Sequence, residues 1–379
     1  MRGRTVATVL TATALTAVAV SASPAVAAPA LHLPEPTGRQ PVGTTSLYLK
    51  DTSRPDPWVP SVNARELMVS VFYPARSAHG ETKRYMTPVE SKALLEESGL
   101  AGVPPDVLST VRTNAIVDAP PVTRRPHSIP LVVLSPGFKK SRATLSSLAE
   151  DLASHGNIVA VVDHTYENVA TTFPDGRVTT CVACGDYNDA FWHKLQWGRG
   201  ADVSFVLDEL TGPRSKWRGA NLIDPSKIAM AGHSVGGASA VQAMLGDTRI
   251  KAGIDMDGMT NVPLPAPGLS RPFLLLGRQN TYTPGTPGGP AASWERDWPL
   301  LTGWKRWLTV EGMEHPTFTD VGVLAGQYGI DFGATIDADR ALEITRTYVR
   351  AFFHLHLRGR PQPLMAAPSP LFPEVTFHG

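Results

Sequence analysis

Cysteine, net charge and long apolar runs are all scarce in this chain. Only two of its 379 residues are cysteines, and the formal net charge is +1. A charge this close to zero, without a basic stripe or an acidic tail, argues against a nucleic-acid-binding protein. Outside the N-terminal segment no apolar run is long enough to cross a bilayer as a helix. With 42% hydrophobic and 18% charged residues, the composition is that of one large globular domain or two small ones.

Motifs for binding phosphate, dinucleotides and metals are also absent. The sequence has no Walker loop, no Gly-x-Gly-x-x-Gly after a predicted strand, and no His-Glu-x-x-His or other His/Cys ligand set. We therefore expect neither a metal nor another cofactor. We find no internal repeat.

The N-terminal segment has the pattern of a secretory signal peptide. A basic start at Arg2 and Arg4 precedes an apolar stretch too short to span a bilayer, and Ala-Val-Ala at 25–27 supplies a cleavage pattern. We predict a signal peptide over residues 1–27 and a secreted catalytic domain over residues 28–379. An uncleaved anchor is the alternative, whereas a lipoprotein would need a cysteine directly after the apolar run.

The two cysteines, Cys181 and Cys184, lie in a polar connection with the sequence CVAC. In a secreted chain this spacing favours a small local disulfide. A redox motif would need the start of a helix beside a βαβ unit, and a zinc site would need two more ligands nearby. Free thiols are the remaining alternative.

Apolar runs of strand length alternate with amphipathic helices along most of the chain. The clearest unit joins apolar runs at 130–134 and 157–162 through a helix whose apolar residues follow the i, i+3, i+4, i+7 spacing. Further strands are predicted at 45–50, 66–73, 228–231, 251–257, 272–276 and 304–310, and further helices at 89–98, 191–210, 238–245 and 337–357. This alternation predicts an α/β fold with a mostly parallel central sheet and helices on both faces. Functional residues of such sheets lie on loops after the C-terminal strand ends.

The stretch around Ser234 is the strongest functional signal. An apolar strand leads into Gly232-His233-Ser234-Val235-Gly236, and small helix-compatible residues follow. Strand, Gly-x-Ser-x-Gly turn and helix in this order predict a nucleophile elbow, which presents the serine hydroxyl on a sharp turn. The alternative is an ordinary glycine-rich helix start capped by Ser234. His233 is expected to pack behind the elbow rather than to take part in catalysis.

A serine nucleophile needs a base and an acid from elsewhere in the chain. His315 is the only histidine after Ser234 in a loop directly following a predicted core strand, so we predict that it is the base. The strand after the elbow helix ends with two acids, Asp255 and Asp257. Position favours Asp257, which is nearer the C-terminal end of that strand, and Asp255 would then accept hydrogen bonds from backbone donors near the turn.

Two backbone N–H groups should stabilise the developing oxyanion. The N–H of Val235, directly after the nucleophile, is one candidate, and the N–H of Phe138 in the Ser-Pro-Gly-Phe segment after the first parallel strand is the other. That segment could instead be a tight turn only. Asp163 and His164 end a strand and could pair with each other near the substrate pocket, or be ordinary polar residues at a strand end.

The chain resembles the platelet-activating-factor acetylhydrolase branch of the α/β-hydrolases, and also the bacterial cutinases and lipases that share its core. The resemblance lies in segments spread over nearly the whole mature chain: PTGRQPVGTTSL at 36–47, VFYPAR at 71–76, PLVVLSPGFKKSRATLSSLAEDLASHGNIVAVVDH at 130–164, ADVSFVLDEL at 201–210, GHSVGG at 232–237, KAGIDMDGM at 251–259 and EGMEHPTFTD at 311–320. It implies a single-domain α/β-hydrolase fold without a cofactor, with Ser234, Asp257 and His315 as the catalytic triad. It also implies that the Phe138 and Val235 amides form the oxyanion hole.

The resemblance departs from the acetylhydrolases at one position. Their oxyanion loop usually carries His-Gly, whereas this chain has Pro136-Gly137, as the cutinase-like lipases do. We therefore predict a secreted serine esterase for lipid or short-chain esters, in contact with a small-molecule ester or a lipid interface. Alternatives are a cutinase-like polyester hydrolase, a serine peptidase, and a hydrolase fold retained as a binding module.

Overall fold

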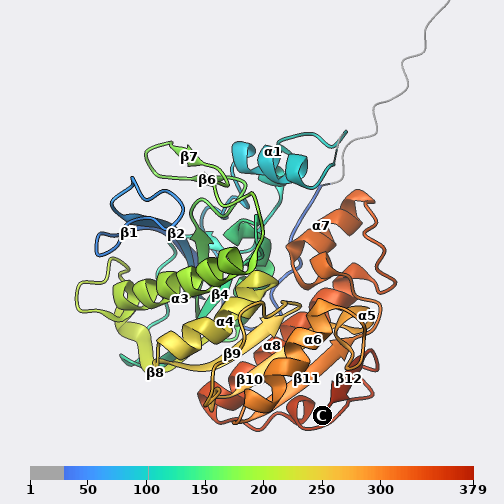
Figure 1. The fold of residues 1–379 in the computed structure, drawn as a ribbon. Coiled ribbons are helices and arrows are strands. Elements are labelled where there is room, and N and C mark those ends of the chain that lie inside the picture. Colours follow the sequence, from blue (N-terminus) through green and yellow to red (C-terminus); the bar gives the residue numbers. More distant parts are fainter. Residues whose placement is uncertain (1–29, 101) are drawn as a thin grey trace, which may run out of the picture.

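The computed structural model describes residues 30–100 and 102–379 (Figure 1). The predicted signal peptide at residues 1–27 lies outside the described residues. In the part of the chain that is described, no helix is both long enough and apolar enough to cross a membrane.

A ten-stranded sheet forms the centre of the molecule, in the order β12-β11-β10-β9-β8-β4-β5-β2-β1-β3. The strands from β11 to β5 run parallel to one another, and β2 and β12 join this block antiparallel at its two ends. The strands are β1 (Val42–Asp51), β2 (Arg65–Pro74), β3 (Ile116–Val117), β4 (Ile129–Ser135), β5 (Ile158–His164), β8 (Ile223–His233), β9 (Ile250–Met256), β10 (Phe273–Arg278), β11 (Lys305–Val310) and β12 (Val375–His378). A separate two-stranded ribbon pairs β6 (Thr171–Thr172) with β7 (Val178–Thr179).

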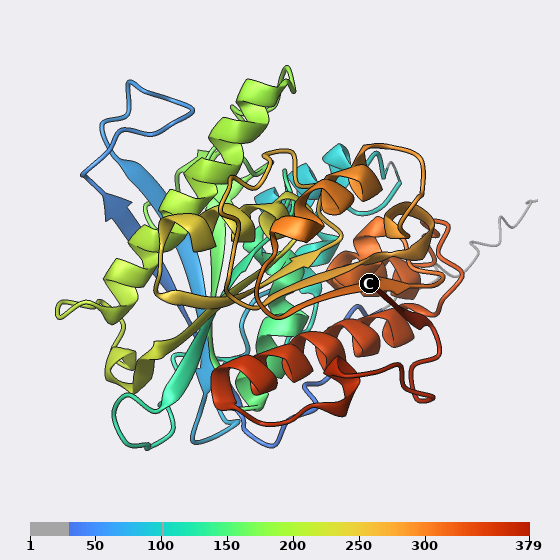
Figure 2. The ribbon, with the colours of Figure 1, turned by 60° about the horizontal axis from the view of Figure 1, so that its bottom comes forward.

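Helices cover both faces of the sheet, as predicted. One core packs α2 (Ser146–Ser154) and α8 (Ala338–Arg358) against one face, and the other packs α3 (Asp189–Thr211) and α4 (Val235–Gly246) against the opposite face. Figure 2 separates α8, in red, from α3, in light green, on the two sides of the sheet. Every residue of β4 and β5 is buried, which explains why these strands are apolar throughout instead of alternating.

The remaining helices lie in connections near the C-terminal strand ends. They are α1 (Pro88–Glu97), α5 (Gln279–Tyr282), α6 (Gly289–Asp297) and α7 (Asp320–Tyr328). Helix α1 starts with a capping box, in which Thr87 and Glu90 each accept a hydrogen bond from the other's backbone N–H, and Pro88 takes the first helical position.

The sequence predicted no strand after 304–310, whereas the structure has one more. The Pro-rich tail adds β12, whose four residues pair antiparallel with β11 at the edge of the sheet. The side chain of His378 in this strand forms a hydrogen bond with that of Thr309, at 2.8 Å. A four-residue edge strand has too few positions to show a periodic pattern, which is why the sequence does not reveal it.

Candidate active site

Ser234 occupies a strained turn between β8 and α4. Its backbone has φ 57° and ψ −131°, in a region that side-chain-bearing residues rarely adopt. Its N–H donates to the carbonyl of Met256 on the neighbouring strand β9, at 2.8 Å. This bond ties the turn to the sheet and stabilises the strained conformation.

The glycines on either side of Ser234 allow this turn to form. A Cβ at Gly236 would lie 2.1 Å from the carbonyl oxygen of Ser135, and one at Gly232 would lie 2.2 Å from the carbonyl carbon of Gly236. Both contacts are with backbone, which cannot swing away as a flexible side chain can. Helix α4 can therefore start directly behind the serine only because both positions lack a side chain.

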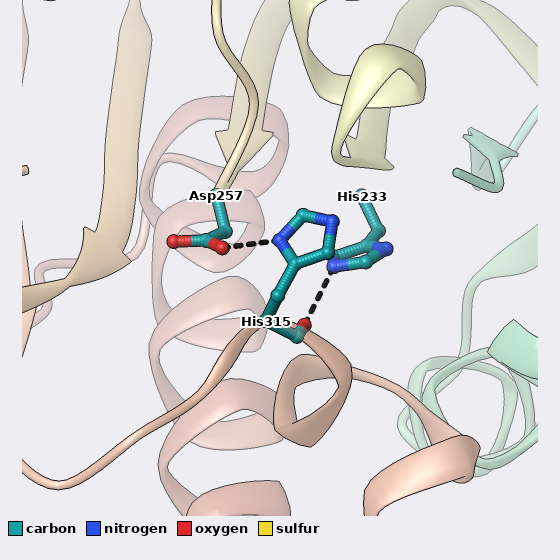
Figure 3. A group of neighbouring side chains, drawn as sticks. All are labelled: His233, Asp257 and His315. Atoms are coloured by element: carbon teal, nitrogen blue, oxygen red, sulfur yellow. Dashed lines mark hydrogen bonds and ion pairs between the residues drawn. The ribbon is translucent and has the colours of Figure 1, made fainter. Parts of the chain in front are cut away.

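Asp257 and His315 meet beside this turn, although they are far apart in the sequence. Asp257 follows the last residue of β9, and His315 opens a 3₁₀ turn (His315–Phe318) after β11. The Nδ1–H of His315 donates to Oδ2 of Asp257 (Figure 3). This hydrogen bond fixes the tautomer, so that Nε2 of His315 is free to accept a proton.

Arg278, at the end of β10, supports the carboxylate of Asp257. Its backbone N–H donates to Oδ1 at 2.9 Å, and its guanidinium Nε lies 3.3 Å from Oδ2. The same guanidinium forms an ion pair with Glu314, the residue before His315, at 3.1 Å. No pattern in the sequence pointed to Arg278, because only the sheet brings β9 and β10 together.

His233 is buried behind the elbow as predicted, and it also contacts His315. The ring centroids of the two histidines lie 4.4 Å apart, and Nε2–H of His233 donates to the backbone carbonyl of His315 at 2.8 Å (Figure 3). Burial, and the nearby ring of His315, lower the pKa of His233 well below its usual value. His233 therefore stays neutral and keeps this hydrogen bond over the physiological pH range.

Asp255 is less well supplied with backbone donors than the sequence suggested. It is fully buried, and within the described residues neither of its carboxyl oxygens has a hydrogen-bond partner. Burial, followed by the charge of Asp257, raises the pKa of Asp255 well above its usual value, which favours its neutral form. The expected contact with backbone donors near the turn is limited to the N–H of Gly258, which acts to lower the pKa of Asp255 but lacks the geometry of a full hydrogen bond. Space for its carboxyl group comes from Gly237 and Gly258, where a Cβ would lie 2.1 and 2.3 Å from Oδ1.

The segment carrying Phe138 approaches the elbow closely. A Cβ at Gly137 would lie 3.2 Å from Nδ1 of His233 and 3.4 Å from Cβ of Ser234. Within residues 30–100 and 102–379, neither the amide of Phe138 nor that of Val235 donates a hydrogen bond to another group of the chain. The Val235 amide also belongs to the first turn of α4, where the helix dipole favours negative charge. Both amides therefore remain candidates for the oxyanion hole.

An aromatic patch surrounds Phe138. Its ring lies 5.6 Å from that of Phe191, 5.7 Å from that of Tyr187 and 6.2 Å from that of Trp192, measured between centroids. Trp58 extends the patch through its contact with Phe191 at 5.4 Å. Val235 belongs to the same apolar cluster, which places these rings next to the turn of the nucleophile.

A disulfide joins Cys181 to Cys184 beside the aromatic patch, with 5.5 Å between their Cα atoms. Ala183, between the two cysteines, is buried against Phe191 and Val235. Its N–H donates to the carbonyl of Tyr166 at 2.9 Å. The cysteine segment therefore packs in the same apolar cluster as Val235, the residue after Ser234.

Asp163 and His164 do not pair with each other, so this one of the two alternatives is not realised. As neighbours on β5, they point to opposite faces of the sheet. Asp163 forms an ion pair with Arg142, whereas His164 forms a hydrogen bond with Asp202 at 2.8 Å. Both side chains are fully buried, so they do not line an open pocket.

One group among the described residues has a geometry that could hold a metal ion, and it is the group formed by His233, Asp257 and His315. Its nitrogen and oxygen atoms lie within 4.8 Å of one another. However, the Nδ1 of His315 and the Nε2 of His233 already form hydrogen bonds within the chain. The arrangement fits proton transfer better than metal binding.

Comparison with known proteins gives a consistent result. The profile of the family described as "Platelet-activating factor acetylhydrolase, isoform II" matches residues 26–180 and 216–276. A "Probable 1-alkyl-2-acetylglycerophosphocholine esterase" of Arthroderma benhamiae is 30% identical over 90% of this chain and 92% of its own. Cutinase 2 of Thermobifida cellulosilytica is 28% identical over 33% of this chain and 38% of its own.

A solved structure extends the similarity to three dimensions. The ferulic acid esterase from Streptomyces cinnamoneus superposes with a TM-score of 0.81 and is 44% identical, over 92% of this chain and all of that one. Together with the sheet described above, this match confirms the predicted α/β-hydrolase fold.

Proposed function

Because the chain belongs to the platelet-activating factor acetylhydrolase isoform II family and is a carboxylic ester hydrolase, we propose that it works through a Ser234–His315–Asp257 triad. The observation that carries the proposal is the hydrogen bond between His315 and Asp257, which leaves Nε2 of His315 free beside the elbow of Ser234.

The reaction proceeds in two halves. His315 accepts the proton of Ser234 as its Oγ attacks the ester carbonyl, and Asp257 stabilises the imidazolium that forms. The amides of Phe138 and Val235 donate to the oxyanion of the tetrahedral intermediate. His315 then gives its proton to the departing alcohol, which leaves an acyl group on Ser234. Water, deprotonated by His315, attacks the acyl-enzyme and releases the acid and the free serine.

We assign lipid or short-chain acyl esters as the substrate class. The support is the family itself and the name of the Arthroderma relative, which specifies an acetylated glycerophospholipid. A cutinase-like polyester hydrolase is the nearest alternative, supported by the Thermobifida relative. A serine peptidase is a more distant one, since the same triad also cleaves amides.

A second candidate substrate is an ester of a planar aromatic acid. The aromatic patch of Trp58, Phe138, Tyr187, Phe191 and Trp192 adjoins the proposed oxyanion hole, and aromatic rings stack favourably on one another. The ferulic acid esterase, at 44% identity, is a relative whose name describes such a substrate.

Secretion is part of the proposal, with residues 1–27 as signal peptide and residues 28–379 as the secreted domain. The disulfide between Cys181 and Cys184 supports it, because disulfides persist in oxidising compartments. Sequencing the N-terminus of protein recovered from the culture medium tests it, and a start at Ala28 or Pro29 is expected. Protein that stays with the cells and begins at Met1 would contradict it.

The test of the activity is a substrate panel with a serine blank. Mature protein is assayed on p-nitrophenyl esters of increasing chain length, an acetylated and a long-chain phospholipid, methyl ferulate and a polyester film. Ser234→Ala should abolish turnover and labelling by a fluorophosphonate, whereas Ser226→Ala, the same change near the opposite end of β8, should preserve both. Hydrolysis by Ser234→Ala at the wild-type rate would refute the mechanism. Cleavage of peptides alone would support the peptidase.

A further inference from the structure

A second chain of serine, histidine and aspartate lies behind the candidate site, closed to solvent. Ser135, His164 and Asp202 are each fully buried, and so are the two arginines and the glutamate that contact them. We call this set the buried charge network, and its members are Arg65, Ser135, His164, Glu167, Arg199 and Asp202. A serine that no substrate can reach is not a nucleophile, so the network serves another purpose.

The hydrogen bonds of the network run in one direction. Asp202 faces Nδ1 of His164 at 2.8 Å, and burial lowers the pKa of His164, so the neutral ring carries its proton on Nδ1. Nε2 of His164 is then an acceptor, and the hydroxyl of Ser135 donates to it at 2.9 Å. The same hydroxyl accepts from Nη1 of Arg199 at 3.2 Å. The protons shared between Asp202, His164, Ser135 and Arg199 therefore each have a single allowed position.

Ion pairs hold both ends of this series of hydrogen bonds, at Asp202 and at Arg199. Arg65 binds Asp202 through two nitrogens, with Nε 3.0 Å from Oδ1 and Nη2 2.7 Å from Oδ2. Arg199 donates from Nε to Glu167 at 2.7 Å, and Glu167 also accepts from the indole of Trp58 at 2.9 Å. Two-pronged arginine contacts of this kind hold direction as well as distance.

The network holds the segment from Ser135 to Lys139, which we call the oxyanion loop. Nη1 of Arg199 donates to the carbonyl of Pro136. On the other side of Phe138, the amide of Lys139 donates to the carbonyl of Glu167 at 3.1 Å. The backbone on each side of the Phe138 amide is thus bound to a residue of the network.

This loop has little internal support, since among the described residues its one local backbone bond runs from the N–H of Lys140 to the carbonyl of Gly137 at 3.2 Å. Pro136 has no N–H, Gly137 has no side chain, and Lys139 has a positive φ of 66°. An oxyanion donor must be held near its working geometry, since a displacement of about 1 Å reduces turnover by roughly a hundredfold. A buried ion pair is weak evidence for stability, because desolvation offsets the attraction between the charges. The buried charge network is therefore better explained by the geometry that it imposes on the oxyanion loop than by a gain in stability.

We propose that Arg199, Ser135 and His164 are positioning residues that hold the Phe138 amide in place for ester hydrolysis. This inference rests on the proposed function, because it assumes that Phe138 and Val235 form the oxyanion hole. The residues act through the backbone of the loop and do not touch the substrate.

The test compares variants inside the network with matched buried variants outside it. Arg199→Lys keeps the charge but loses the guanidinium fork, which reaches Glu167 through Nε and both Ser135 and Pro136 through Nη1. Arg346→Lys is its control, because Arg346 is also buried and binds three backbone carbonyls, those of Pro34, Glu35 and Ser147. Ser135→Ala removes only a hydroxyl, and Ser154→Ala is its control at the N-terminal ends of the parallel strands.

We expect Arg199→Lys to lower kcat by about 10- to 100-fold with KM changed by less than about threefold, since a lost oxyanion donor reduces kcat by about 10²–10³. Ser135→Ala should lower kcat by about three- to tenfold, because the bond of Arg199 to Pro136 remains. Both should weaken binding of a trifluoromethyl ketone, which forms an oxyanion with Ser234, by the same factor as kcat. Arg346→Lys and Ser154→Ala should lower the melting temperature without changing either quantity.

Equal kcat values for the network and control variants would overturn the proposal, and Ser135→Ala decides the matter if Arg199→Lys does not fold. An unchanged affinity for the ketone beside a reduced kcat would also overturn it. Wild-type turnover that Ser234→Ala does not abolish would instead refute the proposed function, so the two failures can be told apart.

Discussion

The rings of His233 and His315 lie 4.4 Å apart, and the first donates a hydrogen bond to the backbone carbonyl of the second. His233 directly precedes Ser234, so this contact joins the turn that carries the proposed nucleophile to the loop that carries the proposed base. Because His233 stays neutral, it holds this loop without adding a positive charge next to His315.

Replacing His233 should slow turnover without destroying the site. His233→Phe keeps a ring of similar size but removes the hydrogen bond, which is worth about 1 kcal/mol. We expect kcat on a short p-nitrophenyl ester to fall about three- to tenfold. His79→Phe, in an exposed loop, is the control and should have no effect. An unchanged kcat in His233→Phe would show that the contact is only packing.

Replacing each of the two acids at the end of β9 by asparagine should have very different effects on kcat. Asp257→Asn removes the charge that orients His315 and should lower kcat by about 10⁴-fold. Asp255→Asn replaces a buried carboxyl, whose neutral form burial favours, by a neutral amide of the same shape and should leave kcat within about threefold. Steady-state kinetics on both variants tests this prediction. A larger loss of kcat in Asp255→Asn than in Asp257→Asn would make Asp255 the acid of the triad.

The two glycines Gly236 and Gly198 should differ sharply in their tolerance of alanine. A Cβ at Gly236 meets the carbonyl oxygen of Ser135 at 2.1 Å, and we expect Gly236→Ala to lower the free energy of unfolding by more than about 3 kcal/mol. At Gly198, inside α3, a Cβ has no neighbour within 4 Å, so Gly198→Ala should be neutral or stabilise by up to about 1 kcal/mol. Urea denaturation measures both, and similar results for the pair would contradict the prediction.

The stability of the protein should depend on His356 below pH 6.5. Burial against Trp304 and Phe352 lowers the pKa of His356 to about 4. Between its unfolded and folded pKa the unfolded chain binds the proton and the folded protein does not, so the free energy of unfolding decreases as the pH falls. His356→Gln removes this dependence. Since His356 is only half-buried, we expect the loss of stability between pH 7 and pH 4.5 to become smaller by about 1 kcal/mol.

The comparison with wild type is needed because other groups act in the opposite sense. Burial raises the pKa of Asp320 to about 7, so this carboxyl gains a proton on folding and favours the folded state as the pH falls. Its contribution is the same in both proteins and cancels in the difference. Parallel stability curves from pH 7 to pH 4.5 would contradict the assignment to His356.

Trp192 should affect one class of ester only. Trp192→Ala removes a ring from the aromatic patch, and we expect kcat/KM for methyl ferulate to fall about three- to tenfold while that for p-nitrophenyl acetate stays within about twofold. Trp197→Ala, on the same helix but outside the patch, is the matched control. An equal loss on both substrates would argue against an aromatic acyl site.

The sequence predicted the core of the fold because its strands and helices carry strong periodic patterns. The predicted strand at 228–231 lies inside β8, and the predicted helix at 337–357 differs from α8 by one residue at each end. Helices α5 and α6 escaped prediction because they lie in a segment rich in proline and glycine, where local composition favours a loop.

The sequence could predict only those residues of the candidate site that directly follow a strand, in the order serine, acid, histidine. Ser234, Asp257 and His315 each stand just after a strand, so they could be proposed from the sequence as a group, and their roles remain a proposal. The contacts of Arg278 with Asp257, His233 with His315 and Arg199 with Ser135 join residues 21, 82 and 64 positions apart. No local pattern encodes such pairs, because the sheet and α3 decide which side chains meet.

The first three turns of helix α3 contribute residues both to the aromatic patch and to the buried charge network. Phe191 and Trp192 contribute to the aromatic patch, while Arg199, two turns further on, holds the oxyanion loop from behind. A redesign of acyl preference that shifts or rotates this helix would therefore also disturb the rate. Altering side chains at its exposed rim, such as Trp192 and the preceding Tyr187, leaves the helix axis where it is. Libraries for new ester substrates should begin at these two positions and keep Arg199 constant.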